Sequence, residues 1–174
     1  MKVTRVVIVA ALVASGLLVG AQSASAHRSG ISSVRAATAE FHDVNEAIEE
    51  GWSIELHDLA GIACIDNPLG GMGIHYVNGA LVGDGQINAR TPEAIIYQPR
   101  ADGSLKMVAV EYVVLKADWE KTHHSVPRLF GQSFELVLAG NRFGLPDFYE
   151  LHAWIWKHNP AGMFEDWNPT VSCP

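Results

Sequence analysis

The stretch AIIYQPRADGSLKMVAVEYVVL (residues 94–115) decides the fold of this chain. Two runs rich in β-branched and aromatic residues flank the sequence Ala-Asp-Gly-Ser (101–104), and an Asp-Gly pair between such runs is typical of a β-hairpin. Residues 93–98 and 105–115 are therefore expected to form two strands that pair antiparallel. Similar but shorter runs predict further strands at residues 74–77, 134–138 and 148–156.

A single amphipathic helix is expected before the strands, over residues 34–50. Its apolar residues recur at steps of three and four, and Gly51 follows as a typical helix-ending residue. The recurring residues are Val34, Ala37, Phe41, Val44 and Ile48. Residues 52–73 are rich in glycine, so we expect a loop there. The pattern predicts an α+β fold with one N-terminal amphipathic helix packed on an antiparallel β-sheet.

The first 26 residues have the three-part pattern of a secretory signal peptide. Lys2 and Arg5 precede an apolar run at residues 6–19, and Ala24-Ser25-Ala26 is a small-residue cleavage site. A membrane anchor is the alternative, but the apolar run is short for a span and is interrupted by a Ser-Gly pair. We expect residues 27–174 to form a single α+β domain that is secreted or otherwise extracytoplasmic, in the periplasm or outside the cell. No stable membrane insertion is expected after cleavage.

The two cysteines, Cys64 and Cys173, are expected to form a disulfide. Outside the cytoplasm two thiols that lie far apart in a small domain are more often bridged than free, although two free thiols are the alternative. Such a bridge would tether the C-terminal tail to an early segment of the domain.

Composition excludes several classes of function. The formal net charge is −7 and no block of lysine or arginine is present, so nucleic acid is not expected as a partner. Two cysteines cannot supply a four-thiolate zinc or iron–sulfur site. The expected domain also lacks the GxSxG, P-loop and GxGxxG motifs of serine esterases, nucleotide hydrolases and dinucleotide oxidoreductases. Any metal would therefore depend on histidines and carboxylates.

Three polar residues lie inside otherwise apolar predicted strands, namely His75, Glu111 and His152. Because side chains alternate along a strand, each of the three residues is expected on a defined face of its own strand. Glu111 shares its face with Met107, Ala109 and Val113. If the strands are neighbours, the three side chains can converge. Two imidazoles and a carboxylate are a common ligand set for zinc, copper, iron or manganese, with positions left open for water or substrate. We therefore predict a divalent transition-metal site, either in a metal-binding protein or in a metal-dependent enzyme of unknown reaction, with Glu111 as the candidate catalytic residue in the second case.

The alternative is a Glu–His hydrogen-bond network that only orders the core of a non-catalytic extracytoplasmic domain, one that binds a small-molecule ligand or a partner. A buried Glu111 carboxylate without a partner would cost several kcal/mol, so a metal, a histidine, Arg128 or Arg142 is expected beside it. His57 either supplies a fourth ligand or is an exposed loop residue, and we favour the exposed position. The aromatic residues within 154–167 either line a ligand site or pack as core, and we favour packing.

His27 offers a separate hypothesis. Cleavage after Ala26 would make it the first residue, where its amine and imidazole together can chelate copper as a histidine brace.

Residues 74–114 resemble the central part of the oil-body-associated protein family, in which an HHYC-type element precedes an LIY strand and a GVEY strand. The matching segments are Ile74-His75-Tyr76, Ala94-Ile95-Ile96-Tyr97 and residues 105–114. His75-Tyr76 and Glu111-Tyr112 stand at matching positions, whereas Val77 or Asn78 replaces the cysteine of the family. The whole chain also looks like uncharacterised secreted bacterial proteins that share the ending ELHxWxWxxNPxGxF, here residues 150–164. Neither resemblance implies a defined activity.

Overall fold

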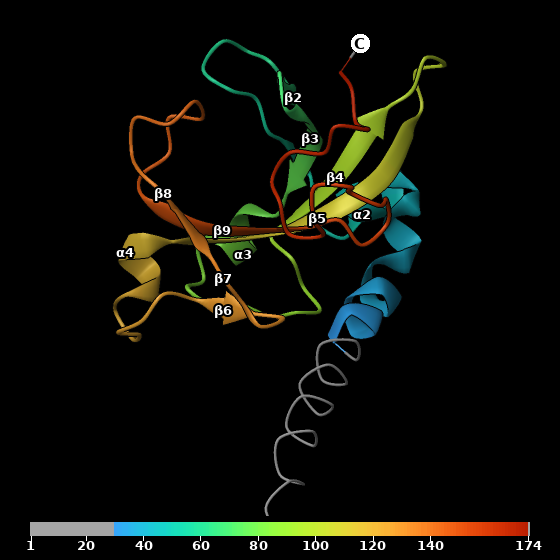
Figure 1. The fold of residues 1–174 in the computed structure, drawn as a ribbon. Coiled ribbons are helices and arrows are strands. Elements are labelled where there is room, and N and C mark those ends of the chain that lie inside the picture. The colour runs from blue at the N-terminus through green and yellow to red at the C-terminus, as the bar shows by residue number, and fades with distance from the viewer. Residues whose placement is uncertain (1–29, 174) are drawn as a thin grey trace, which may run out of the picture.

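The computed structural model describes residues 30–173, which form helices packed on an antiparallel sheet (Figure 1). The predicted signal peptide and His27 lie outside the described residues. The main sheet has seven strands in the order β1-β3-β4-β5-β9-β8, and β2 pairs with β3. The strands of this sheet are β1 (Ile54–Glu55), β2 (Cys64–Asn67), β3 (Gly70–Val77), β4 (Ala94–Pro99), β5 (Leu105–Leu115), β8 (Glu135–Val137) and β9 (Phe148–Ala153). The α+β prediction is therefore confirmed, and the central hairpin β4–β5 is antiparallel as expected.

Shorter elements complete the fold. The strands β6 (Arg128–Leu129) and β7 (Gln132–Ser133) form a separate two-stranded sheet. The short helices α3 (Gly79–Val82) and α4 (Lys116–Trp119) follow β3 and β5 directly. In the described part of the chain, no helix has the length and apolar character of a membrane span.

The N-terminal helical segment covers one face of the sheet, but it is not the single helix expected over residues 34–50. Residues 30–38 are α-helical, and a 3-10 turn η1 (Ala39–His42) follows. The helical conformation is interrupted at Asp43, before α2 (Val44–Glu49) begins. Asp43 is extended, and its side chain accepts a hydrogen bond from the Asn45 N–H, so it caps a new helix. The break changes which side faces the core: Ala47 is buried, whereas Ile48 is 39% exposed.

The core beneath these helices joins them to the sheet. Val34, Phe41 and Trp52 pack in one cluster with side chains from β4, β5 and β9. The Tyr97 hydroxyl, which lies inside this cluster, donates a hydrogen bond of 2.6 Å to the Phe41 carbonyl oxygen. Apolar burial of this extent is the main stabilising contribution to the domain and fixes the face of the sheet that the helices cover.

The glycine-rich segment expected as a loop contains the strands β1 and β2 and the start of β3. Both short strands pair with β3. The glycines are needed because another chain segment passes close by: a Cβ atom on Gly70, whose φ is 141°, would meet the backbone of Asn168 in the C-terminal tail. Glycine here therefore marks a close approach of two backbones rather than the absence of a strand.

A β-bulge changes the expected faces of β5. Ile96 pairs with Ala109 and the next residue, Tyr97, pairs with Met107, which leaves Val108 as an extra residue in β5. Consequently Met107 lies in the core cluster beneath the helices, and Val108 packs on the opposite side with Ala109. The prediction that Met107 shares a face with Glu111 is wrong, because simple alternation does not continue through a bulge.

The last strand is shorter than the predicted 148–156, because β9 ends at Ala153. Trp154 packs on the face of the sheet opposite the helices. Trp156 lies beyond the end of the strand and packs against the core cluster beneath the helices. The Trp154 indole N–H donates to the Glu165 carbonyl oxygen and the Trp156 indole N–H to the Thr38 hydroxyl. Both indoles therefore take part in packing, and both also border a cavity of about 490 Å³.

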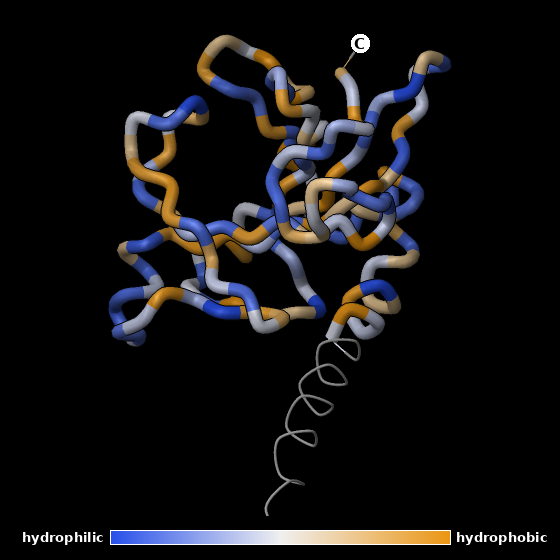
Figure 2. The backbone as a smooth tube through the Cα atoms, viewed as in Figure 1, coloured by the Kyte–Doolittle hydropathy of each residue, from blue (hydrophilic) through white to orange (hydrophobic). Residues whose placement is uncertain are grey.

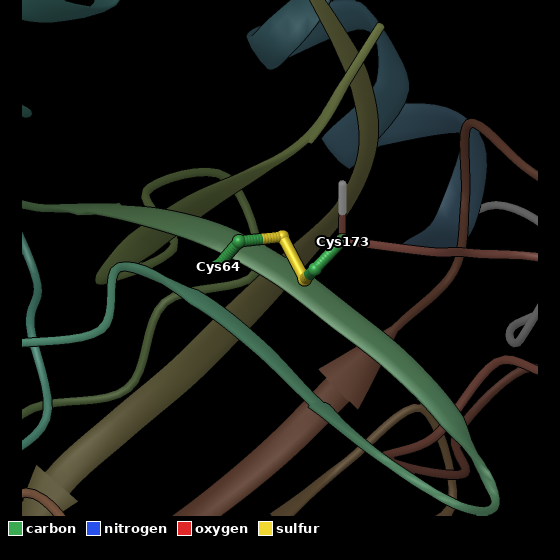
Figure 3. Close-up of a disulfide and its surroundings, with 2 residues drawn as sticks. All are labelled: Cys64 and Cys173. Atoms are coloured by element: carbon green, nitrogen blue, oxygen red, sulfur yellow. A yellow bond between two sulfur atoms is a disulfide. The ribbon is translucent and has the colours of Figure 1, made fainter.

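The C-terminal tail lies across the face of the sheet opposite the helices. The Cys64–Cys173 disulfide is present, as predicted, with Cα atoms 5.6 Å apart (Figure 3). The backbones of Gly71 and Asn168 exchange two hydrogen bonds, and Val171 packs with the buried residues of this face. The tail is thus held by covalent, backbone and apolar contacts together.

Candidate metal centre

Strand register brings His75, Glu111 and His152 to the same face of the sheet. Glu111 lies directly opposite His152 on β9 and opposite Ala94 on β4. His75 on β3 lies opposite Ile96, which is two residues further along β4. All three side chains are therefore close neighbours in the interior of the sheet. Each is buried, with exposed fractions of 2%, 6% and 1% respectively.

The donor atoms of these side chains form a compact group. His75 Nε2 lies 3.4 Å from His152 Nε2 and 3.6 Å from Glu111 Oε2. One ligand atom from each of the three residues can be chosen such that all lie within 4.8 Å of one another. Ligands at about 2.1 Å from a tetrahedrally coordinated zinc ion are separated by about 3.4 Å. These two separations therefore have the size of the edges of a zinc coordination tetrahedron.

The pKa values of the two imidazoles are shifted in opposite directions. Burial lowers the pKa of His75 to about 4, although the charge of Glu111 acts in the other direction. Burial also opposes protonation of His152, but the carboxylates of Glu111 and Asp166 outweigh it and raise its pKa to about 9. Near neutral pH His75 is therefore neutral and available as a ligand, whereas His152 carries a proton that a metal ion would displace.

The Nδ1 atoms of His75 and His152 are buried and form no hydrogen bond with any residue in the described range. His152 Nδ1 lies 3.4 Å from Asp166 Oδ1 and 3.7 Å from Glu111 Oε1. If His152 binds a metal through Nε2, its Nδ1–H faces Asp166. A carboxylate in that position is the usual orienting partner of a metal-binding histidine.

A second buried carboxyl group, Glu150, lies beside Glu111. Val113 is the register partner of Glu150, so Glu150 is a diagonal neighbour of Glu111 on the same face. Burial, followed by the charge of Glu111, raises the pKa of Glu150 to about 9. Glu150 is therefore uncharged near neutral pH.

An apolar cavity of about 270 Å³ opens beside the three donors. His75, Glu111 and Glu150 form part of its wall, and apolar residues from several elements form the remainder, among them Leu56, Val113, Val137, Phe143 and Phe148. The group of donors thus borders a space large enough for a small molecule.

Two loops meet over this side of the sheet. Arg142, in the β8–β9 loop, forms a 2.8 Å ion pair with Asp58 in the β1–β2 loop, and the Leu59 N–H donates to the Arg142 carbonyl oxygen. Both loops carry hydrophobic segments, shown in orange in Figure 2. Leu56 and Phe143, which flank this bridge, line the cavity. The bridge between the loops therefore forms part of a roof over the cavity.

The other residues weighed from the sequence lie elsewhere. Arg142 binds Asp58, and Arg128 donates hydrogen bonds to Ser133 and Gly131, so neither arginine is placed to neutralise Glu111. His57 has a half-exposed side chain and contacts Glu55, which agrees with an exposed loop position.

Sequence reasoning missed Asp166 and the cavity. Asp166 comes from the tail, 14 positions after His152 and beyond the strand pattern that selected the other residues. The disulfide was the one available signal, because a tail held against the sheet can bring a polar side chain to the site.

Comparisons of the chain with protein-family models, with curated proteins and with solved structures gave no match. The resemblance to the oil-body-associated protein family therefore stays a prediction.

Proposed function

We propose that this protein is an exported metalloprotein that binds one divalent transition-metal ion through His75, Glu111 and His152. The supporting observation is the spacing of the buried donors, with His75 Nε2 at 3.4 Å and 3.6 Å from its two neighbours. Three protein ligands with an open fourth position are typical of catalytic zinc sites, and two histidines with one glutamate form one such set. Here the open position would face the cavity, because His75 and Glu111 both line it.

Zinc is the ion that we propose, because two histidines and one glutamate with an open fourth position form one of the catalytic zinc ligand sets. A zinc ion would supply Lewis acidity at the inner end of the cavity. Glu111 would contribute the negative charge of the ligand set, and Asp166 would orient the His152 ring.

The location of the protein is part of the proposal. The Cys64–Cys173 disulfide is consistent with an oxidising compartment. The sequence pattern of residues 1–26 supports export. We infer that the metal is bound in the periplasm or outside the cell.

The deciding experiment is elemental analysis of the oxidised, secreted protein after dialysis against zinc, copper, iron and manganese in turn. We expect one zinc ion per chain, and little or none in the His75→Ala and His152→Ala variants. His57→Ala is the matched control, because its imidazole is solvent-accessible and outside the site. Circular dichroism of every variant separates loss of metal from loss of fold.

A purely structural network is the second candidate, and the attraction between a protonated His152 and Glu111 favours it. In that case no ion binds stoichiometrically, and zinc leaves the unfolding midpoint unchanged. Retention of metal by both site variants would equally exclude the proposed ligands.

A further inference from the structure

The cavity beside the donors is chemically one-sided. Its polar side chains, His75, Glu111 and Glu150, lie together on β3, β5 and β9. The rest of the wall is apolar and comes from other residues of the sheet, from α3 and from the loops that follow β1 and β8. An occupant would therefore have its polar end against these three side chains and its apolar body against the rest of the wall.

The wall chemistry excludes several kinds of occupant. Its residues include no lysine or arginine, and two of its three polar side chains are carboxyl groups. Phosphorylated and multiply anionic molecules would lack a counter-charge other than the metal. A sugar would leave most of its hydroxyls without a partner against the apolar wall, which is costly.

The volume limits the size of the occupant. A cavity of about 270 Å³ is larger than the roughly 150 Å³ space that accommodates benzene and close to the lower limit for small-molecule pockets. One aromatic ring with a short chain, or one unbranched acyl chain of medium length, fits this range.

We propose that the cavity binds a small, predominantly apolar molecule that carries one oxygen-containing group at one end, such as an acyl or arylalkyl carbonyl compound, and that this group coordinates the metal. This inference rests on the proposed metal site and adds the class of its ligand. The metal binds the oxygen, and the apolar walls select the attached chain.

The probes are acetohydroxamic and octanohydroxamic acid, which share one zinc-binding group and differ only in chain length. Titration calorimetry of the zinc-loaded, oxidised protein should show tighter binding of the longer acid, by up to about fourfold for each buried methylene. The same titration after removal of zinc should show that binding of both acids is strongly reduced.

Two neighbouring residues of β8 provide the variant and its control. Val137 is partly buried and lines the cavity, whereas Leu136 is 41% exposed and lies on the other face of the strand. Val137→Phe should reduce the preference for the longer acid, and Leu136→Phe should retain it. If Val137→Phe does not fold, Val82→Phe fills the cavity from α3 instead.

Each contrary outcome has a distinct meaning. Equal affinity for the two acids in a protein that holds zinc would overturn the inference and leave the metal site intact. Chain-dependent binding that is unchanged by removal of zinc would show that the polar group is not at the metal, which also overturns it. Failure of the metal site would be recognised earlier, from the zinc content before any acid is added.

Discussion

Glu93 provides a test of the electrostatics at a buried carboxyl group outside the proposed ligand set. Its side chain is 2% exposed, and its Oε2 accepts a 3.0 Å hydrogen bond from the Val113 N–H. Burial raises its pKa from an ordinary 4.5 to about 8, with smaller contributions from the charges of Asp84 and Glu111. Because the folded protein retains a proton that the unfolded chain releases, stability falls as pH rises from about 4.5 to about 8.

The Glu93→Gln variant removes this loss of stability at higher pH, and its amide oxygen can still accept the hydrogen bond from the Val113 N–H. A difference of about 3.5 pH units corresponds to at most about 5 kcal/mol of unfolding free energy, lost at about 1.4 kcal/mol per pH unit. Relative to the wild-type protein, the variant should therefore gain stability from pH 5 to pH 8. Urea unfolding at each pH measures the gain, and Glu49→Gln, an exposed substitution on α2, is the control. A stability difference between variant and wild type that is the same at both pH values would refute the reasoning.

Three further predictions concern the tail and the roof. Replacing Cys64 and Cys173 by serine removes a disulfide that spans 109 residues and should lower the unfolding free energy by about 5 kcal/mol. Urea unfolding measures this loss, and an unchanged unfolding midpoint would contradict the prediction. Asp166→Asn should weaken zinc binding by about 10- to 100-fold in competition titrations, because it removes the carboxylate beside a ligand imidazole. The exposed Glu165→Gln substitution should not, and equal effects of the two would contradict the orienting role. Arg142→Ala should speed hydrogen exchange in residues 56–62 without changing zinc content, and unaltered exchange would show that the ion pair does not hold the loops together.

Much of the fold could be predicted because its strands have a strong period-two pattern and clear turn residues. The Asp-Gly turn at 101–104 correctly predicted the central hairpin, and the extent of β5 was predicted in full. The grouping of His75, Glu111 and His152 followed from alternation and neighbouring strands alone, because between Glu111 and His152 no bulge intervenes. A buried charge in an apolar strand is a strong constraint, since it must find a partner within a few ångströms.

The features that were missed depend on contacts between distant segments. The bulge at Val108 has no local sequence signal, and it reverses the face of Met107. Asp43 separates two helical segments that share the same apolar periodicity, so periodicity alone predicts one continuous helix. Gly70 was interpreted as a strand breaker, although it accommodates a tail about 100 residues further along the chain. Long-range approach of this kind is not contained in any short window of sequence.

The tail also sets an order in which the site can be completed. The three donors come from strands, whereas Asp166 and Cys173 follow all of them in the chain. The strands can therefore bring the donors together before the tail adds the carboxylate beside His152 and the bridge to Cys64. Because the bridge forms only where thiols are oxidised, an ion bound at the proposed centre would come from the metal supply of that compartment. Availability there, rather than the intrinsic order of affinities among divalent ions, would then decide which metal the mature protein carries.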